Sequence, residues 1–147
     1  MAIVKNLLGS KGKAVWSVAP TTKTIDALKL MSEKDIGALL VMDGVKLVGI
    51  ISERDFARRL AKSGVCDVNQ PVQEVMITNV YYANLENTTE ECMKLMTDKH
   101  IRHLPIIDKG KVVGMITIGD IVKEIIDNQK STIKSLENYI TGQSFEL

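Results

Sequence analysis

The sequence predicts an α/β (α+β) protein built from two pseudo-symmetric β-α-β-β-α repeats packed as one module. A shift of 65 positions, which aligns Asp55 with Asp120, superposes the two halves without a gap from Val15 to beyond Leu60. A gapless internal repeat indicates two copies of one supersecondary unit. Each copy also carries a short apolar run, then a hydroxyl residue, then an aspartate three places on, a pattern that starts a helix after a strand.

The repeat has a period longer than typical solenoid units and occurs only twice, which favours a pair over an array. We expect an N-terminal helix and loop, two repeats, a linker, and a C-terminal helix and tail. These segments span residues 1–14, 15–65, 66–79, 80–127 and 128–147. Identical residues in the two copies are Thr24/Thr89, Lys29/Lys94, Leu30/Leu95, Met31/Met96, Ile36/Ile101, Asp43/Asp108, Gly49/Gly114 and Asp55/Asp120.

Composition excludes several classes of protein. The chain has 147 residues, 45% of them hydrophobic, and a net charge of +1, which gives no electrostatic basis for nucleic-acid or membrane-surface binding. Cys66 and Cys92 are too few for a disulfide framework, and with His100 and His103 they do not form a zinc spacing. We expect Cys92 to be a buried apolar residue, no metal site, no membrane span, and a cytoplasmic location.

Local patterns place the elements of the first half. Apolar residues at helical spacing open the chain, and β-type runs follow between turn residues. The chain is predicted to open with a helix carrying Ile3, Val4, Leu7 and Leu8, a basic loop at residues 9–13 and a strand at 15–18. A helix capped by Thr22 or Thr24 follows and ends at 35–37. Strands at 38–42 and 47–51 are then joined by a turn at Asp43-Gly44, and a helix capped by Ser52 comes after them.

The second half repeats this order. A linker at residues 62–70 and a short helix at 71–76 precede it. The predicted elements are a strand at 80–82, a helix carrying Cys92, Met93, Leu95 and Met96, strands at 103–107 and 112–116, and a helix capped by Thr117. The last helix carries an apolar stripe from Ile121 to Ile140, which is longer than half of a small domain can cover. We therefore expect a homodimer that buries the stripe.

The doubled motif suits an anion. A strand, a sharp turn and a helix N-terminus, at Ser52–Asp55 and again at Thr117–Asp120, leave several free N–H groups that point outward. The alternative is that each motif only caps its helix, and two copies in identical context favour a site.

The chain resembles a tandem CBS-domain module over about residues 13–127. The resemblance rests on Ile-Gly-Ala-Leu-Leu-Val at 36–41, Ile-Arg-His-Leu-Pro-Ile-Ile-Asp at 101–108, and the doubled Gly-x-x-Ser/Thr-x-x-Asp. Ser-Glu-Arg-Asp at 52–55, Thr-Ile-Gly-Asp at 117–120 and Tyr-Ile-Thr-Gly at 139–142 are similar to small stand-alone bacterial pairs. The family binds ligands such as AMP, ADP, ATP, NAD(H) or S-adenosylmethionine in clefts between the halves, and its members usually act as regulatory sensors.

The resemblance implies a stronger and a weaker cleft. In the stronger cleft we expect Asp120 to bind ribose, Arg102 and His103 to meet phosphate, and Lys11 to reach the phosphates. The other residues expected there are Thr117, Gly119, Gly37, Ala38, Ile36, Trp16 and Val18. The weaker cleft would hold Ser52, Arg54 and Asp55, with Gly37 in place of an arginine. The alternatives are a solvated Arg102 or Lys11, a strand-edge His103 without a ligand role, and a core Trp16.

We interpret the chain as a non-catalytic, regulatory adenine-nucleotide-binding module for AMP or an NAD(H)-type ligand, sensing energy or redox state. No nucleophile–base pair or metal cluster in the sequence argues for an enzyme, and no catalytic cofactor is expected. The alternative is a ligand-free interaction module that regulates a partner by contact alone.

Overall fold

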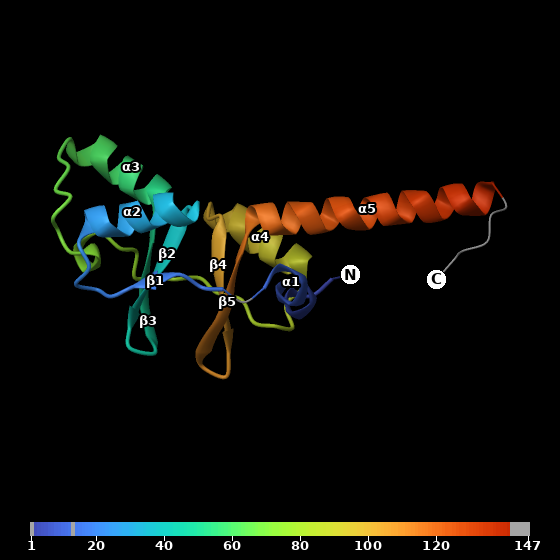
Figure 1. Ribbon diagram of the computed structural model, residues 1–147, viewed down its shortest axis with the longest axis horizontal. Coiled ribbons are helices and arrows are strands. Elements are labelled where there is room, and N and C mark those ends of the chain that lie inside the picture. Colours follow the sequence, from blue (N-terminus) through green and yellow to red (C-terminus); the bar gives the residue numbers. More distant parts are fainter. Residues whose placement is uncertain (1, 13, 142–147) are drawn as a thin grey trace.

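The computed structural model describes residues 2–12 and 14–141, as two α+β halves that lie side by side. Each half pairs an antiparallel hairpin with helices, and the last helix, α5, projects far beyond the body towards the C-terminus (Figure 1). The predicted fold class, with its two pseudo-symmetric repeats, is confirmed. Lys13 and Gly142, which belong to the predicted loop and tail, lie outside the described residues.

The first half contains a three-stranded sheet in the order β1-β2-β3. β1 pairs in parallel with β2, and β2 pairs antiparallel with β3. The predicted strand at residues 15–18 is shorter than expected, since β1 contains only two residues. The elements are β1 (Ser17–Val18), α2 (Thr24–Lys34), β2 (Ala38–Asp43), β3 (Lys46–Ser52) and α3 (Glu53–Ser63).

The predicted threonine cap of α2 is wrong. Lys23 is the N-cap and its side chain makes no capping hydrogen bond, whereas Thr24 is already helical and fully buried. The Thr24 hydroxyl donates to the carbonyl oxygen of Gln70 at 2.7 Å, so it ties the helix start to the segment after α3. A buried hydroxyl needs a partner, and a carbonyl distant in sequence supplies one here.

The second half contains a two-stranded sheet, β4-β5. After η1 (Val72–Glu74), which lies between the repeats, the elements of this half are α4 (Thr89–Lys99), β4 (His103–Asp108), β5 (Lys111–Thr117) and α5 (Ile118–Ile140). Residues 80–82 form no regular strand, contrary to the prediction, and only Ala83 bridges to Ile106.

Pro105 explains this missing strand. In the first half, the N–H of Leu40 donates to the carbonyl of Trp16, which extends the parallel pairing. The residue aligned with Leu40 is Pro105, and the residue aligned with Trp16 is Tyr81. Proline has no N–H, so the corresponding bond to Tyr81 cannot form and the ladder stops after the bonds at Ala83.

The helix ends and the irregularities of the hairpins recur at aligned positions of the two halves. Asp35 and His100 end α2 and α4 with φ of 52° and 55°, in the left-handed region. The hairpin registers shift at Val41/Met42 in one half and at Ile106/Ile107 in the other. These irregular features are conserved between the halves, so the repeat extends from side-chain pattern to backbone conformation.

Two segments from outside the repeats complete the cores. α1 (Val4–Lys11) covers the second half, and η1 covers the first. Leu8 packs where a side chain on Gly114 would lie, and Met76 packs where one on Gly49 would lie. The predicted loop at residues 9–13 is therefore wrong for residues 9–11, which extend the helix because its apolar face is buried.

The two halves have separate buried cores. The first contains Ala27, Met31, Leu39, Val41, Ile51 and Val72. The second contains Val4, Leu7, Leu8, Ala83, Cys92, Met96, Leu104, Ile106, Ile116 and Ile121. Cys92 is 1% exposed, which confirms the prediction that it is a buried apolar residue.

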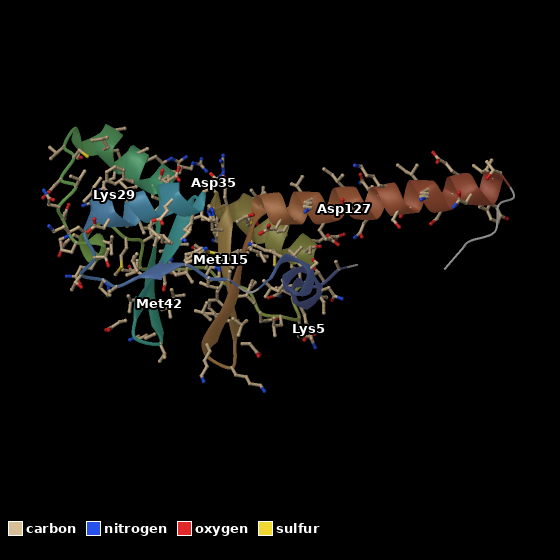
Figure 2. All side chains as sticks on the ribbon, in the orientation of Figure 1. Lys5, Lys29, Asp35, Met42, Met115 and Asp127 are labelled. Carbon is tan, nitrogen blue, oxygen red and sulfur yellow. The ribbon has the colours of Figure 1, made fainter. Side chains whose placement is uncertain are left out.

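α5 is one continuous helix of 23 residues, so the predicted boundary between residues 127 and 128 falls inside it. Ile121 is fully buried, whereas the outer part of the stripe stands clear of the body in the direction of Asp127 and beyond (Figure 2). Ile133, Leu136 and Ile140 are 55%, 58% and 81% exposed. Within the described residues, no helix is both long enough and apolar enough to cross a membrane.

Candidate functional site

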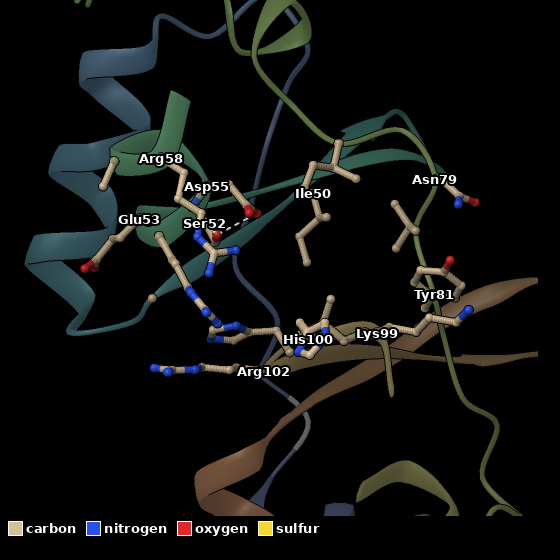
Figure 3. Close-up of a pocket in the computed structure, with 17 residues that line it drawn as sticks. Ile50, Ser52, Glu53, Asp55, Arg58, Asn79, Tyr81, Lys99, His100 and Arg102 are labelled. Carbon is tan, nitrogen blue, oxygen red and sulfur yellow. Dashed lines mark hydrogen bonds between the residues drawn. The ribbon is translucent and has the colours of Figure 1, made fainter. Parts of the chain in front are cut away.

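A cavity of about 990 Å³ lies between the two halves (Figure 3). The first half contributes the start of α3, including Ser52 and Asp55, and the second contributes residues 99–103. The segment at residues 77–81, which joins the halves, forms a third side. A cavity of this size is within the range of small-molecule sites.

Ser52 and Asp55 form the helix cap that the sequence predicts. The N–H of Asp55 donates to the Ser52 hydroxyl oxygen at 3.1 Å, and that hydroxyl donates to Asp55 Oδ2 at 2.7 Å. No ion pair to Asp55 occurs among the described residues. The carboxylate therefore retains acceptor capacity towards the cavity.

Basic side chains dominate the polar lining of the cavity. Arg54 and Arg58 come from α3, and Arg102 comes from the turn before β4 (Figure 3). The remaining basic or titratable groups are Lys99, His100 and His103, and the acidic ones are Glu53 and Asp55. This excess of cationic groups favours an anionic ligand, and arginine suits phosphate because its donors form a rigid fork.

Apolar and aromatic residues line the rest of the cavity. Ile50, Ile77 and Val80 contribute aliphatic surface, and Tyr81 contributes a ring. The Lys99 ammonium lies 5.2 Å from the centroid of the Tyr81 ring, so a cation–π contact holds that ring. A flat heteroaromatic group fits such a mixture of aliphatic and aromatic surface.

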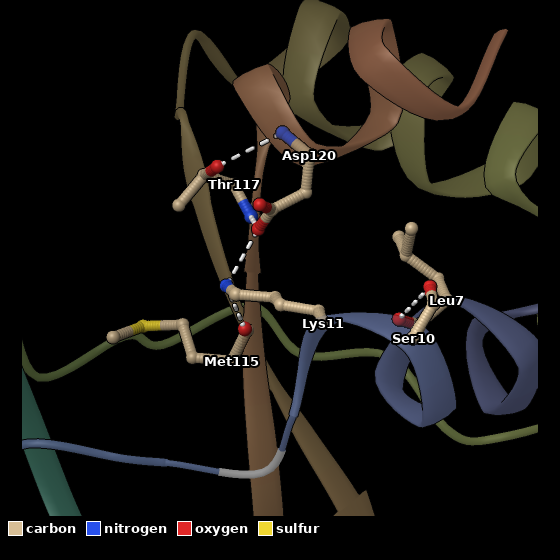
Figure 4. Close-up of polar contacts among 6 residues, drawn as sticks. All are labelled: Leu7, Ser10, Lys11, Met115, Thr117 and Asp120. Carbon is tan, nitrogen blue, oxygen red and sulfur yellow. Dashed lines mark hydrogen bonds and ion pairs between the residues drawn. The ribbon is translucent and has the colours of Figure 1, made fainter. Parts of the chain in front are cut away.

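The second cap, formed by Thr117 and Asp120, differs from the first because it also holds an ion pair with Lys11 (Figure 4). Asp120 Oδ2 accepts from the backbone N–H of Thr117 at 2.8 Å, and the N–H of Asp120 donates to the Thr117 hydroxyl at 3.1 Å, a complete capping box. Lys11 Nζ also donates to Asp120 Oδ2 at 2.5 Å and to the Met115 carbonyl at 2.6 Å.

These contacts set the pKa of Asp120. Burial alone would raise the pKa of this carboxyl, but the hydrogen bonds from Lys11 and Thr117 and the charge of Lys11 outweigh burial and lower it. Asp120 is therefore an ionised carboxylate that is already paired with Lys11, whereas Asp55 has no ion pair among the described residues.

His103 lies between the two caps. Burial lowers the pKa of His103 most, and the charges of Lys11 and Arg102 lower it further, against the opposing effect of Asp120 and Asp55. The imidazole is thus neutral at neutral pH, so one of its ring nitrogens can donate a hydrogen bond and the other can accept one.

The structure groups the predicted site residues differently from the sequence interpretation. Gly37, Arg102 and His103 were expected beside Asp120, and they line the cavity that contains Asp55. The backbone of Arg102 nevertheless lies at the start of α5, because the Arg102 carbonyl accepts from the N–H of Ile118 at 2.9 Å. Lys11 was expected at a phosphate and instead pairs with Asp120.

Several predicted residues lie outside the lining of this cavity: Trp16, Val18, Ile36, Ala38, Thr117, Gly119 and Asp120. Trp16 is 41% exposed beneath the Lys34 ammonium, 4.6 Å from its ring centroid, so it is neither a core residue nor part of this cavity. Ala38 is buried in β2.

Sequence reasoning missed several lining residues, and those with polar or aromatic side chains include Arg58, Tyr81, Lys99 and His100. Arg58 lies one helical turn after Arg54, and this i, i+4 spacing is a usable signal. Tyr81 aligns with Trp16, so the repeat could have suggested an aromatic residue there. A second hollow of about 760 Å³ shares Asp55, Arg58 and Ile77 with the first.

Comparisons with known proteins agree with the repeat. The CBS domain family model matches residues 12–62 and 72–127. The CBS domain-containing protein CBSX3, mitochondrial, of Arabidopsis thaliana is 32% identical over 148 residues, covering 95% of this chain and 72% of that protein.

Solved structures show the same architecture. A protein with CBS domains from Burkholderia ambifaria is 41% identical with a TM-score of 0.82, covering 87% of this chain and 96% of the other. The CBS domain pair of protein MJ0100, in complex with 5′-methylthioadenosine and S-adenosyl-L-methionine, is 26% identical with a TM-score of 0.76, covering 87% and 98%. With two matched copies in one chain and the fold of its neighbours, this protein belongs to the CBS-domain family as a tandem pair.

Proposed function

We propose that this CBS pair is a non-catalytic sensor that binds an adenine nucleotide, AMP or an NAD(H)-type ligand, in the cavity containing Asp55. One observation carries the proposal: the Asp55 carboxylate, without an ion pair among the described residues, faces a cavity whose remaining polar lining is mainly cationic. A nucleotide needs both an acceptor for its ribose diol and donors for its phosphate.

Each part of the ligand has a counterpart in the lining. Asp55, in the first turn of α3, accepts from the ribose hydroxyls. Arg54, Arg58 and Arg102 bind the phosphate from two sides. Ile50, Ile77 and Tyr81 enclose the adenine ring.

This proposal reverses the order of the two clefts that the sequence suggested. The Asp120 cleft was ranked first because Arg102 and His103 were assigned to it. Both residues line the Asp55 cavity, and Asp120 already holds Lys11. The complex of MJ0100 with two adenosine-containing compounds supports this class of ligand for the family member described here.

Thermal unfolding with AMP, NAD⁺, NADH and adenosine tests the proposal. A ligand that binds only the native state adds about 2.7 kcal/mol at a hundred times its dissociation constant. We expect AMP or an NAD(H)-type ligand to raise the melting temperature. No shift with any adenine nucleotide at millimolar concentration would favour the alternative, a module that regulates a partner by contact alone.

Calorimetry on three variants locates the site. A lost hydrogen bond to a charged group costs about 1.5–3 kcal/mol, or roughly ten- to a hundredfold in affinity. Asp55→Ala should weaken the binding of AMP by that amount. Arg102→Ala should weaken the binding of AMP more than the binding of adenosine. Asp120→Ala should have the smaller effect on this cavity. The opposite order of Asp55→Ala and Asp120→Ala would restore the ranking made from the sequence.

We also propose a homodimer formed through α5. Its exposed apolar residues recur at alternating intervals of four and three residues, which is the heptad pattern of paired helices. Gln129 is the single polar residue in that series. The series is Val122, Ile126, Gln129, Ile133, Leu136 and Ile140, and its apolar members are 44–81% exposed. The same face on a second copy matches it in length and chemistry.

Light scattering across micromolar concentrations tests the dimer. The native chain should be dimeric, and Ile133→Asp should give monomers because it buries a charge in the seam. Ser131→Asp, two residues away on the opposite side of the helix, is the matched control and should remain dimeric. A native chain that is monomeric throughout this range contradicts the pairing.

A further inference from the structure

Lys11 connects the N-terminal helix to the second cap. Its ammonium donates to Asp120 Oδ2 and to the Met115 carbonyl, across separations of 109 and 104 residues (Figure 4). The side chains of Lys11 and Asp120 are 30% and 23% exposed, so the pair is partly shielded from water. Partial burial makes this pair stronger than a surface salt bridge.

The packing of α1 fixes the position of Lys11. Val4 and Leu8 are buried in the second core, and Leu8 lies against Gly114 on β5. Lys11 is the last residue of α1, one turn beyond Leu7 and Leu8, and Gly12 ends the helix with φ of 98°. The helix therefore delivers the ammonium to the cap as a consequence of core packing.

Among the described residues, the first half has no matching contact. Val72 corresponds to Val4, because the N–H of Val72 donates to the Thr22 carbonyl and that of Val4 to the aligned Asn87 carbonyl. Met76 corresponds to Leu8, because Met76 packs on Gly49 as Leu8 packs on Gly114. The 3-10 turn η1 ends at Glu74, and Ile77 then bridges to Ile50 of β3. A short turn in one half and a longer helix in the other thus leave Asp55 open and Asp120 paired.

We propose that Lys11 is a specificity-determining residue at the α5 cap: it occupies the carboxylate of Asp120, which aligns with Asp55, and yields only to adenosine ligands that bring a phosphate. The inference rests on the proposed function, because it extends the ribose-accepting role of Asp55 to the aligned carboxylate of Asp120. A neutral nucleoside must break the ion pair and leave both charges less well paired. A nucleotide supplies a phosphate to which the flexible Lys11 side chain can turn.

The ion pair itself is tested without any ligand. Carbon-detected NMR titration of the Asp120 carboxyl should show a higher pKa in Lys11→Met than in the native chain, since a hydrogen bond and a positive charge are lost. Lys5→Met, an exposed lysine on the same helix, is the control and should leave the titration unchanged. An unchanged titration in Lys11→Met overturns the inference.

Specificity is tested in an Asp55→Ala background, which removes the ribose acceptor of the first cavity. Calorimetry measures the affinity for AMP and the affinity for adenosine. The ratio of the AMP affinity to the adenosine affinity should fall about tenfold or more when Lys11→Met is added. Adenosine should bind at least about threefold more tightly, and AMP should bind more weakly. Lys5→Met should leave the ratio unchanged.

The possible failures are distinct. If the native chain and all variants bind none of AMP, NAD⁺, NADH and adenosine, the proposed function fails, and the specificity role of Lys11 fails with it. If the proteins bind AMP but the ratio is unchanged by Lys11→Met, or adenosine binds less tightly, only the role of Lys11 is overturned.

Discussion

The imidazole of His103 lies against Gly37, with Cε1 and Nε2 each 3.4 Å from the position that a Cβ on Gly37 would take. Gly37 aligns with Arg102, and Ala38 aligns with His103, so the two halves meet through corresponding turns. The small residue in one half makes room for the large one in the other.

The Gly37 contact predicts a sharp dependence on side-chain size. Gly37→Ala adds a methyl at ordinary contact distance and should change the free energy of unfolding by less than about 1 kcal/mol. Gly37→Leu must displace the His103 ring, and we expect a loss of about 1–3 kcal/mol. Urea unfolding measures both. Equal stability of the two variants would show that His103 moves freely.

Gly49 and Gly114 should be the glycines least tolerant of alanine among those described. A Cβ on Gly114 would lie 2.8 Å from Leu8 Cδ2, and one on Gly49 would meet Met76 and lie 3.0 Å from the Ile77 carbonyl oxygen. We expect each alanine variant to lose about 1–3 kcal/mol in urea unfolding, because the covering segment must shift.

Gly9 is the control for this pair. It is helical and exposed, and a Cβ there meets nothing within 4 Å. Gly9→Ala should therefore stabilise the protein by about 0.5–1 kcal/mol through helix propensity. A gain in all three variants would contradict the assigned packing of Leu8 and Met76.

The pKa of His103 predicts how stability depends on pH. Because its folded pKa is below the ordinary 6.5, the unfolded chain takes up a proton first as pH falls. The contribution of the neutral ring is complete above about pH 6.5, is lost progressively below it, and stops changing once the folded pKa is passed. Urea unfolding at several pH values between 7.5 and 5 should show this loss.

His103→Gln should remove that part of the pH dependence. His100→Asn is the matched control, because asparagine tolerates the left-handed conformation that His100 adopts at the end of α4. If the slope is unchanged in His103→Gln, another group is responsible.

The two cysteines should differ in reactivity. Burial, with a smaller effect of the Glu91 charge, raises the pKa of Cys92 to about 11, whereas Cys66 is exposed. A thiol-reactive chromogen at pH 8 should label one thiol in the native protein and two in denaturant. Cys66→Ser should eliminate the native signal. Labelling of two thiols without denaturant would contradict the burial of Cys92.

Local signals in the sequence were sufficient for most elements. The caps at Ser52 and Thr117 are hydrogen bonds between residues three apart, so adjacent residues specify them. The hairpins followed from apolar runs flanked by turn residues, and the repeat placed both of them at once. The apolar stripe also indicated a last helix that reaches Ile140. The length of α1 was not predictable in this way, because its apolar face is buried against the second half.

The sequence by itself determined the doubled fold, the two caps and the chemistry that an aspartate at a helix start can perform. Only the tertiary structure decided that Arg102 and His103 line the cavity of Asp55 and that Lys11 pairs with Asp120, because each arrangement joins segments far apart in the chain. The first strand of the second half shows the same division. Its apolar residues predicted a strand, but the missing N–H of Pro105, on the neighbouring strand, prevented the ladder from forming.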